Sequence, residues 1–242
     1  MSYPLGVVRG DPGDEYAQGT DQLHALGTLM VFSNGRKFRY IKAGELLLVA
    51  ESLQGPDEEV EVDLTVAAGT IGDQFISLTA KGTEAKDFYK EGFIYISEPG
   101  SSSCRIYQIS GHAVLAIAAG NIINIVDDAG TQEAIVGDEV GMIQASPWDG
   151  VKSNTGGQDA PFAGIAVEDI ASASYGWAQT GGVCLARCAA TVSEADCLTA
   201  ISANASELDA KAASTESAVG YVIRGQTGTA TIECSLVFLT VD

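Results

Sequence analysis

Short stretches in which apolar and polar residues alternate recur along the chain and predict β-strands. In the clearest internal example, Val60–Val66, every second residue is Val or Leu, with Glu, Asp and Thr between them. A period of two places the apolar residues on one face of a strand and the polar residues on the other. We therefore expect a half-buried strand whose polar face lies in water.

The end of the chain shows the same alternation. Residues 217–239 resemble a β-hairpin, and the last strand predicts one apolar face made by Ala230, Ile232, Cys234, Leu236 and Phe238. We expect that face to pack into the core, with Thr229, Thr231, Glu233 and Ser235 on the opposite face.

Residues 164–188 predict a second hairpin, with Gly181-Gly182 at the bend. Before that bend, Tyr175, Trp177 and Gln179 are expected to face one way and the residues between them the other. Near the start of the patterned region, Ser33-Asn34-Gly35 predicts a tight turn between two strands.

These elements predict an all-β fold of antiparallel β-sandwich or barrel-like subdomains with long loops. Residues 1–26 are rich in Gly, Asp and Pro without a period, and we interpret them as an extended N-terminal arm or a long loop. Residues 27–145 are expected to form one β-rich domain and residues 162–242 a C-terminal β subdomain. Residues 146–161, with Pro, Gly and Asn, predict a linker loop between them.

The charge balance narrows the choice of partners. The 242 residues carry a formal net charge of −19. Nucleic-acid binding through phosphates requires clustered Lys and Arg, as does binding to an anionic membrane surface, so we expect neither partner. Acidic residues keep a protein soluble, and they also suit a protein that faces solvent on the outside of an assembly.

The first residues lack the basic start and apolar core of a signal peptide, so we expect a soluble protein made in the cytosol. The longest apolar stretch, Ala113–Val126, is interrupted by Gly and Asn and is too short to span a bilayer.

The five cysteines are odd in number and do not indicate a disulfide framework. Cys184 and Cys188 have no histidine near them, so we interpret them as buried hydrophobic residues rather than metal ligands.

Residues capable of catalysis are scarce. The imidazoles are His24 and His112, and His112 follows a glycine in an apolar strand, as a packed or turn histidine would. The chain has no Gly-x-Ser-x-Gly elbow and no Gly-rich phosphate loop, and its paired carboxylates fall at predicted turns. The sequence therefore predicts no enzyme, no cofactor and no metal site.

Three residues are candidates for an interface with another protein: Trp148, Tyr3 and Arg9. Trp148 lies in the predicted linker, where it either anchors an interface or holds the loop against its own domain. The sequence leaves both alternatives open.

Several segments together resemble the capsid decoration, or cement, proteins of tailed bacteriophages: residues 35–44, 92–96, 105–109, 164–167, 175–181 and 219–223. The resemblance rests on strand pattern and on a few glycine and aromatic positions over residues 27–240. It implies a β-rich, non-enzymatic virion protein that assembles in the host cytoplasm as a homotrimer. On the outer capsid surface it would bridge subunits of the major capsid protein.

Two other functions remain open on the residues alone. One is a tail, fibre or spike component that binds a host receptor or glycan, which exposed loop aromatics would favour. The other is a polysaccharide hydrolase on a β scaffold, which requires two facing carboxylates in a cleft.

Overall fold

The chain is all-β. The computed structural model describes residues 6–56, 60–97, 104–135, 139–157, 160–189, 192–202, 204–225 and 234–242. Within these ranges the regular elements are strands and one short 3-10 helix, η1 (Asp14–Tyr16). No helix in the described ranges has the length and apolar character needed to cross a lipid bilayer.

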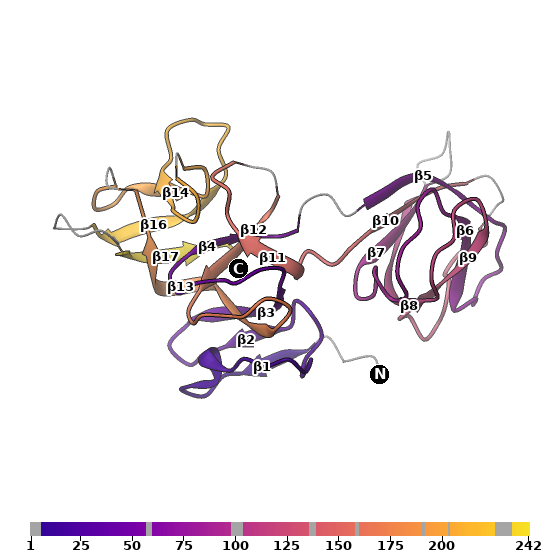
Figure 1. Cartoon of the computed structure of the whole chain (residues 1–242), viewed down its shortest axis with the longest axis horizontal. Coiled ribbons are helices and arrows are strands. Elements are labelled where there is room, and N and C mark those ends of the chain that lie inside the picture. Colours follow the sequence, from indigo (N-terminus) through magenta and orange to yellow (C-terminus); the bar gives the residue numbers. More distant parts are fainter. Residues whose placement is uncertain are drawn as a thin grey trace. The chain divides into compact units, whose positions relative to one another are not determined.

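The strands belong to two compact units, the barrel unit (Glu58–Ser146) and the sheet unit (Tyr3–Asp57 with Pro147–Asp242). The barrel unit contains β5 (Val60–Val66), β6 (Phe75–Thr79), β7 (Phe93–Ser97), β8 (Cys104–His112), β9 (Gly120–Ile125) and β10 (Glu139–Gln144). The sheet unit contains β1 (Val7–Arg9), β2 (Leu29–Val31), β3 (Lys37–Ala43), β4 (Ser52–Gln54), β11 (Asp149–Ser153), β12 (Phe162–Ala166), β13 (Tyr175–Arg187), β14 (Cys197–Thr199), β15 (Asp209–Ala210), β16 (Ala218–Arg224) and β17 (Cys234–Thr240) (Figure 1).

This division differs from the domains expected over residues 27–145 and 162–242. The barrel unit is inserted into the sheet unit, because β3 and β4 pair with strands that follow the barrel in the sequence. In particular, β3 pairs with β13 and β4 pairs with β12. Such long-range pairings leave no mark in local composition.

The barrel unit is a closed circuit of antiparallel strands in the order β10-β5-β6-β9-β8-β7, which the β7–β10 pairing completes. Its interior is filled by aliphatic side chains such as Leu64, Ile94 and Ile109, each at most 1% exposed. The alternation expected for β5 therefore holds at Leu64 and Val66. Val62, however, is 45% exposed, because Asp63 has a left-handed φ of 52° and the pairing with β10 shifts register there.

The sheet unit contains a second closed circuit. Its strands are ordered β1-β2-β3-β11-β4-β12-β13-β17-β16-β14-β15, and the additional β3–β13 pairing joins β3, β11, β4, β12 and β13 into a ring. A buried cluster takes one side chain or more from each of these strands, including Ile41, Leu53, Val151, Ala163 and Ala178. The barrel-like architecture expected from the sequence is thus present in both units.

The segment expected to be a hairpin bent at Gly181-Gly182 is instead one continuous strand, β13. Its first half pairs with β3 and its second half with β17, and Gly181 faces both Lys37 and Thr240. Gly182 has φ +81°, and the ladder to β3 shifts register just before it. The two glycines therefore lie at a β-bulge of one strand, where it passes from one partner to the next.

The faces of the last strand, β17, are the reverse of those expected. Val237 and Leu239 are 0% and 1% exposed and belong to a buried cluster with Cys184, Val222 and others. Leu236 and Phe238 lie on the opposite face and are partly exposed. Both faces of the strand are apolar, so the alternation alone did not determine which one enters the core.

The predicted linker over residues 146–161 contains β11, a strand held between β3 and β4.

Residues 6–26 are folded against the sheet rather than extended away from it. There β1 pairs in parallel with β2, Ala25 and Leu26 are buried, and Glu15 forms an ion pair with Arg36 at 2.9 Å.

Candidate functional site

The outward side of the β13–β17–β16 sheet carries a continuous row of large apolar side chains. We call this set the outer apolar face: Val183, Leu185, Tyr221, Leu236 and Phe238. Register places them together, since Val183 and Tyr221 both lie opposite Phe238, and Leu185 lies opposite Leu236. The Tyr221 and Phe238 rings are stacked, with centroids 5.3 Å apart and planes 13° apart.

The outer apolar face is exposed although its residues are hydrophobic. Val183, Leu185 and Tyr221 are 42%, 59% and 45% exposed. The reverse side of the same strands forms a complete core, so these side chains are not needed to fill it. A groove of about 400 Å³ adjoins the face and shares Val183 and Leu185 with it.

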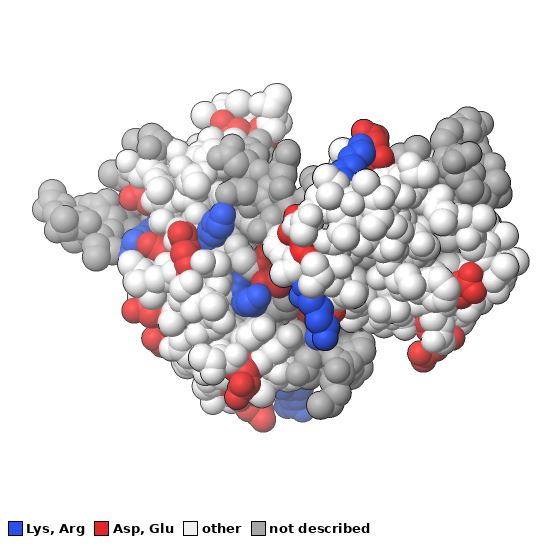
Figure 2. All heavy atoms as spheres, turned by 45° about the vertical axis from the view of Figure 1, so that its right-hand side comes forward, with Lys and Arg blue, Asp and Glu red and all other residues white. Residues whose placement is uncertain are grey.

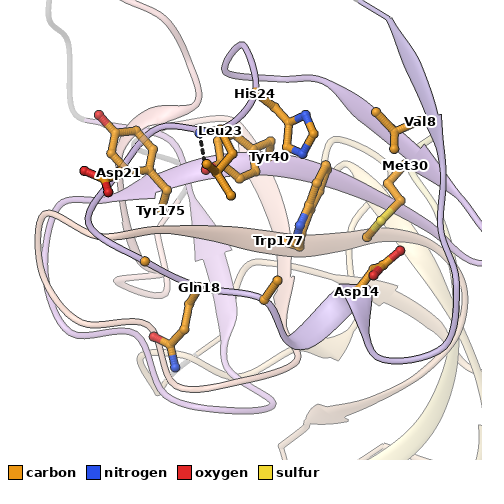
Figure 3. Close-up of a pocket in the computed structure, with 12 residues that line it drawn as sticks. Val8, Asp14, Gln18, Asp21, Leu23, His24, Met30, Tyr40, Tyr175 and Trp177 are labelled. Atoms are coloured by element: carbon orange, nitrogen blue, oxygen red, sulfur yellow. Dashed lines mark hydrogen bonds between the residues drawn. The ribbon is translucent and has the colours of Figure 1, made fainter.

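A second concave feature lies where residues 14–24 cross the sheet. It is a pocket of about 290 Å³ whose walls include the rings of His24, Tyr40, Tyr175 and Trp177 (Figure 3). The Tyr40 ring lies 4.9 Å from Trp177, edge to face, and 5.9 Å from Tyr175, stacked. We call this feature the aromatic pocket.

The segment over the aromatic pocket is fixed to the sheet by main-chain contacts. The Leu23 amide donates a hydrogen bond to the Tyr40 hydroxyl, drawn as a dashed line in Figure 3, and Gly19 forms a bridge with Tyr175. The exposed side chains of Asp14, Gln18 and Asp21 add polar groups to the lining. No Lys or Arg is among the described residues that line it.

The two histidines lie in different places: His24 lines the aromatic pocket, and His112 is the last residue of β8. His112 is 2% exposed, and its Nε2 accepts a hydrogen bond from the Tyr89 amide at 3.0 Å. Its Nδ1 lies 2.6 Å from the Ala113 carbonyl oxygen, so both ring nitrogens are engaged in main-chain contacts. This confirms the interpretation of His112 as a packed histidine.

The buried carboxylate of Glu51 is also engaged in structural contacts. It accepts hydrogen bonds from Arg187 at 2.9 Å and from Ser153 at 2.8 Å, which join β13 and β11 to the start of β4. Within the described ranges no three His, Cys, Asp or Glu side chains are grouped so that they could hold a metal ion.

The two cysteines on β13 and just after it are buried and free, as expected. Burial raises the pKa of the Cys184 thiol to about 12 and that of Cys188 to about 11. Both thiols are therefore protonated at neutral pH, and a protonated thiol is a poor nucleophile and a poor metal ligand.

Charged side chains do not gather into one binding patch on the visible face. Figure 2 shows Asp and Glu scattered among uncharged residues and Lys and Arg as a few separate side chains. Several of the basic groups are in ion pairs, for example Arg39 with Asp242 and Lys42 with Asp149.

The structure describes two of the three residues expected at an interface. Trp148 is half-buried against two core clusters of the sheet unit, and the Arg39 guanidinium lies 5.9 Å from its ring centroid. This favours the alternative in which Trp148 holds its own segment in place. Arg9 is exposed at the end of β1, and Tyr3 lies outside the described residues.

Sequence reasoning missed both surface features described above. The signal for the outer apolar face was present, since residues 236–239 are apolar at every position.

Comparison with protein-family models, curated proteins and solved structures found no match to this chain. The structure shows an all-β protein. We therefore infer its function from the surfaces described above.

Proposed function

We propose that the protein is a virion structural protein that decorates and stabilises the outer surface of a phage capsid. In this role it bridges subunits of the major capsid protein and associates with itself, as a homotrimer. The observation that carries the proposal is the outer apolar face of β13, β17 and β16.

An apolar surface of this kind is costly in a protein that works alone. Soluble monomers expose few contiguous apolar patches, and larger ones mark contacts with other proteins. Here the outer apolar face lies on paired strands, so its shape is fixed before a partner arrives and little ordering is needed on binding. A contact repeated on every subunit of a shell gains strength through multivalency.

The charge of the chain supports the same role. With a net charge of −19, free copies repel one another at long range, which keeps them soluble. At physiological ionic strength salt largely screens exposed charges that are more than about 8 Å apart, so the repulsion between copies weakens and an apolar face still drives association. The proposal includes neither nucleic acid nor a membrane as a partner.

The test is co-sedimentation of the purified protein with undecorated, expanded phage capsids, with its mass in solution measured alongside. The expected result is saturable binding at a fixed ratio to the major capsid protein and a trimeric mass. Leu185→Asp should lower the affinity for shells about tenfold or more, since it puts a charge at the centre of the contact.

Ile117→Asp is the matched control. Ile117 is 62% exposed, close to the 59% of Leu185, but it lies in the barrel unit. Both variants should keep the wild-type melting temperature. No binding by the wild-type protein would overturn the proposal, and unchanged binding by Leu185→Asp would remove the outer apolar face from it.

The second candidate is a tail, fibre or spike component that binds a host receptor or glycan. The aromatic pocket favours it, because rings and polar side chains together are typical of ligand sites. Absence of shell binding, combined with retention of the protein on a glycan array or on host cells, would select this candidate.

A further inference from the structure

We propose that the aromatic pocket of the sheet unit binds an organic ammonium group, such as a lysine side chain or a quaternary ammonium head. This inference is independent of the capsid-decoration proposal, because it concerns a different surface of the unit, and it names a ligand class for the pocket on which the second candidate rests. It rests on the ring arrangement, the lining charges and the size of the pocket.

The rings are arranged around the pocket at different angles. His24 lies 5.2 Å from Tyr40 with planes 84° apart, and 5.3 Å from Trp177 with planes 50° apart. Tyr40 and Trp177 are themselves inclined by 62°. The face of an aromatic ring is negative, and a cation within about 6 Å of a ring centroid is attracted to it.

The charges at the pocket have the sign that a cation requires. Asp14 and Asp21 are both exposed and appear on opposite sides of the view in Figure 3. Because no Lys or Arg is among the described lining residues, these carboxylates are not neutralised from within the pocket. The net charge of −19 adds a long-range attraction for cations.

The size and shape favour a compact cation over a sugar. The volume of about 290 Å³ is at the lower limit for pockets that hold drug-sized molecules. Trp177 and Tyr40 are only 4% and 3% exposed, so the ring surface open to the pocket belongs to the half-buried His24 and Tyr175, and no broad, flat ring face is offered. A sugar ring stacks on such a face, whereas an ammonium group needs only a small hollow with negative walls.

The experiment compares choline with 3,3-dimethylbutan-1-ol, which has nearly the same shape and no charge. The readout is the indole N–H resonance of Trp177 in a nitrogen–proton correlation spectrum, with Trp148, which is not among the lining residues, as internal reference. The expected result is a saturable shift of Trp177 with choline alone, which weakens as salt is added.

The variant Asp14→Asn/Asp21→Asn should weaken choline binding about tenfold, since it removes both carboxylates with little change in shape. Asp11→Asn is the matched control, because Asp11 precedes η1 in the same segment and is not among the lining residues. It should bind choline as the wild type does.

An equal response to the neutral alcohol would overturn the proposal and show an unselective apolar pocket. A response to methyl glycosides without one to choline would overturn it in favour of a sugar site. Unchanged binding by the double variant would also count against it, because the carboxylates would then play no part.

Discussion

The barrel unit and the sheet unit differ in whether their outermost strands have a free edge. The barrel unit is one uninterrupted stretch of chain, and its first and last strands are joined to their neighbours in a closed circuit. The sheet unit is assembled from two stretches separated by the whole barrel, and its order of strands ends at β1 and β15. Closed circuits leave no edge for another chain, whereas open sheets do.

This difference has a physical consequence for folding. Pairing of strands that are close in sequence costs less chain entropy than pairing across a long insertion. We therefore expect the barrel unit to fold on its own and the sheet unit to form later, with two separate unfolding transitions. The following predictions test that separation, starting with the largest effect.

The largest effect is expected from Val237→Asp in the sheet unit. Val237 is fully buried, and a carboxylate placed there without a partner costs several kcal/mol. The sheet-unit transition should disappear or fall by many degrees, while the barrel-unit transition stays in place. Differential scanning calorimetry measures both.

Leu236→Asp is the matched control on the adjacent residue of β17. Its side chain lies on the outer apolar face, so the melting temperature should stay close to that of the wild type. A large loss of stability in Leu236→Asp would contradict the assignment of faces. Simultaneous loss of both transitions in Val237→Asp would contradict the independence of the units.

A smaller effect is expected from Ile109→Ala in the barrel unit. Ile109 is 0% exposed in the barrel core, and its truncation leaves a cavity that costs about 2–5 kcal/mol. The barrel-unit transition should shift and the sheet-unit transition should not. Ile106→Ala in the same strand is the control, since Ile106 is 55% exposed and should change stability by less than about 0.5 kcal/mol.

The smallest effect is a pH dependence of the sheet unit. Hydrogen bonds from Arg39 hold the pKa of the Asp242 carboxyl below its usual value, and one from Thr180 adds to them against the opposing effect of burial. Because the folded pKa is the lower one, the contribution is complete above the unfolded value of 3.8 and is lost as pH falls through the folded pKa.

Asp242→Asn should therefore destabilise the sheet unit at pH 6 and reduce its loss of stability below about pH 4. Melting temperatures measured from pH 6 to pH 2.5 check this, with the barrel-unit transition as the internal reference. If the melting temperatures of the variant and the wild type fell equally with pH, Asp242 would not be the cause of the acid-induced loss of stability.

The features predicted correctly from the sequence are those that depend on near neighbours. The turn at residues 33–35 joins β2 and β3, with Gly35 at φ +86°. The strand at Val60–Val66 and the packed His112 follow from local pattern in the same way. The all-β class follows from the recurrence of such strands.

The features that were missed depend on partners far along the chain. Gly181-Gly182 has the composition of a turn, but the strand continues because β17 pairs with the residues after the glycines. The orientation of β17 depends on the same pairing, since its residues are apolar on both sides. Residues 146–161 have loop composition, yet β3 and β4 recruit part of them as β11.

The aromatic pocket was hidden for the same reason. Its rings come from the segment before β2, from β3 and from β13, so Tyr40 and Trp177 are far apart in sequence. The acidic residues of its rim lie in a segment that was interpreted as an arm or a loop. Only the pairing of β13 with β3 brings these groups together.

The place at which the barrel unit enters the sheet unit makes the protein modular. The chain leaves the sheet after β4 and returns at β11, and these two strands are antiparallel neighbours, with Lys152 opposite Gln54. If the barrel were cut out, the remaining ends would need only an ordinary hairpin connection of a few residues. The same junction would accept a foreign domain whose own ends lie close together, which makes it a natural grafting point for displaying one protein on another.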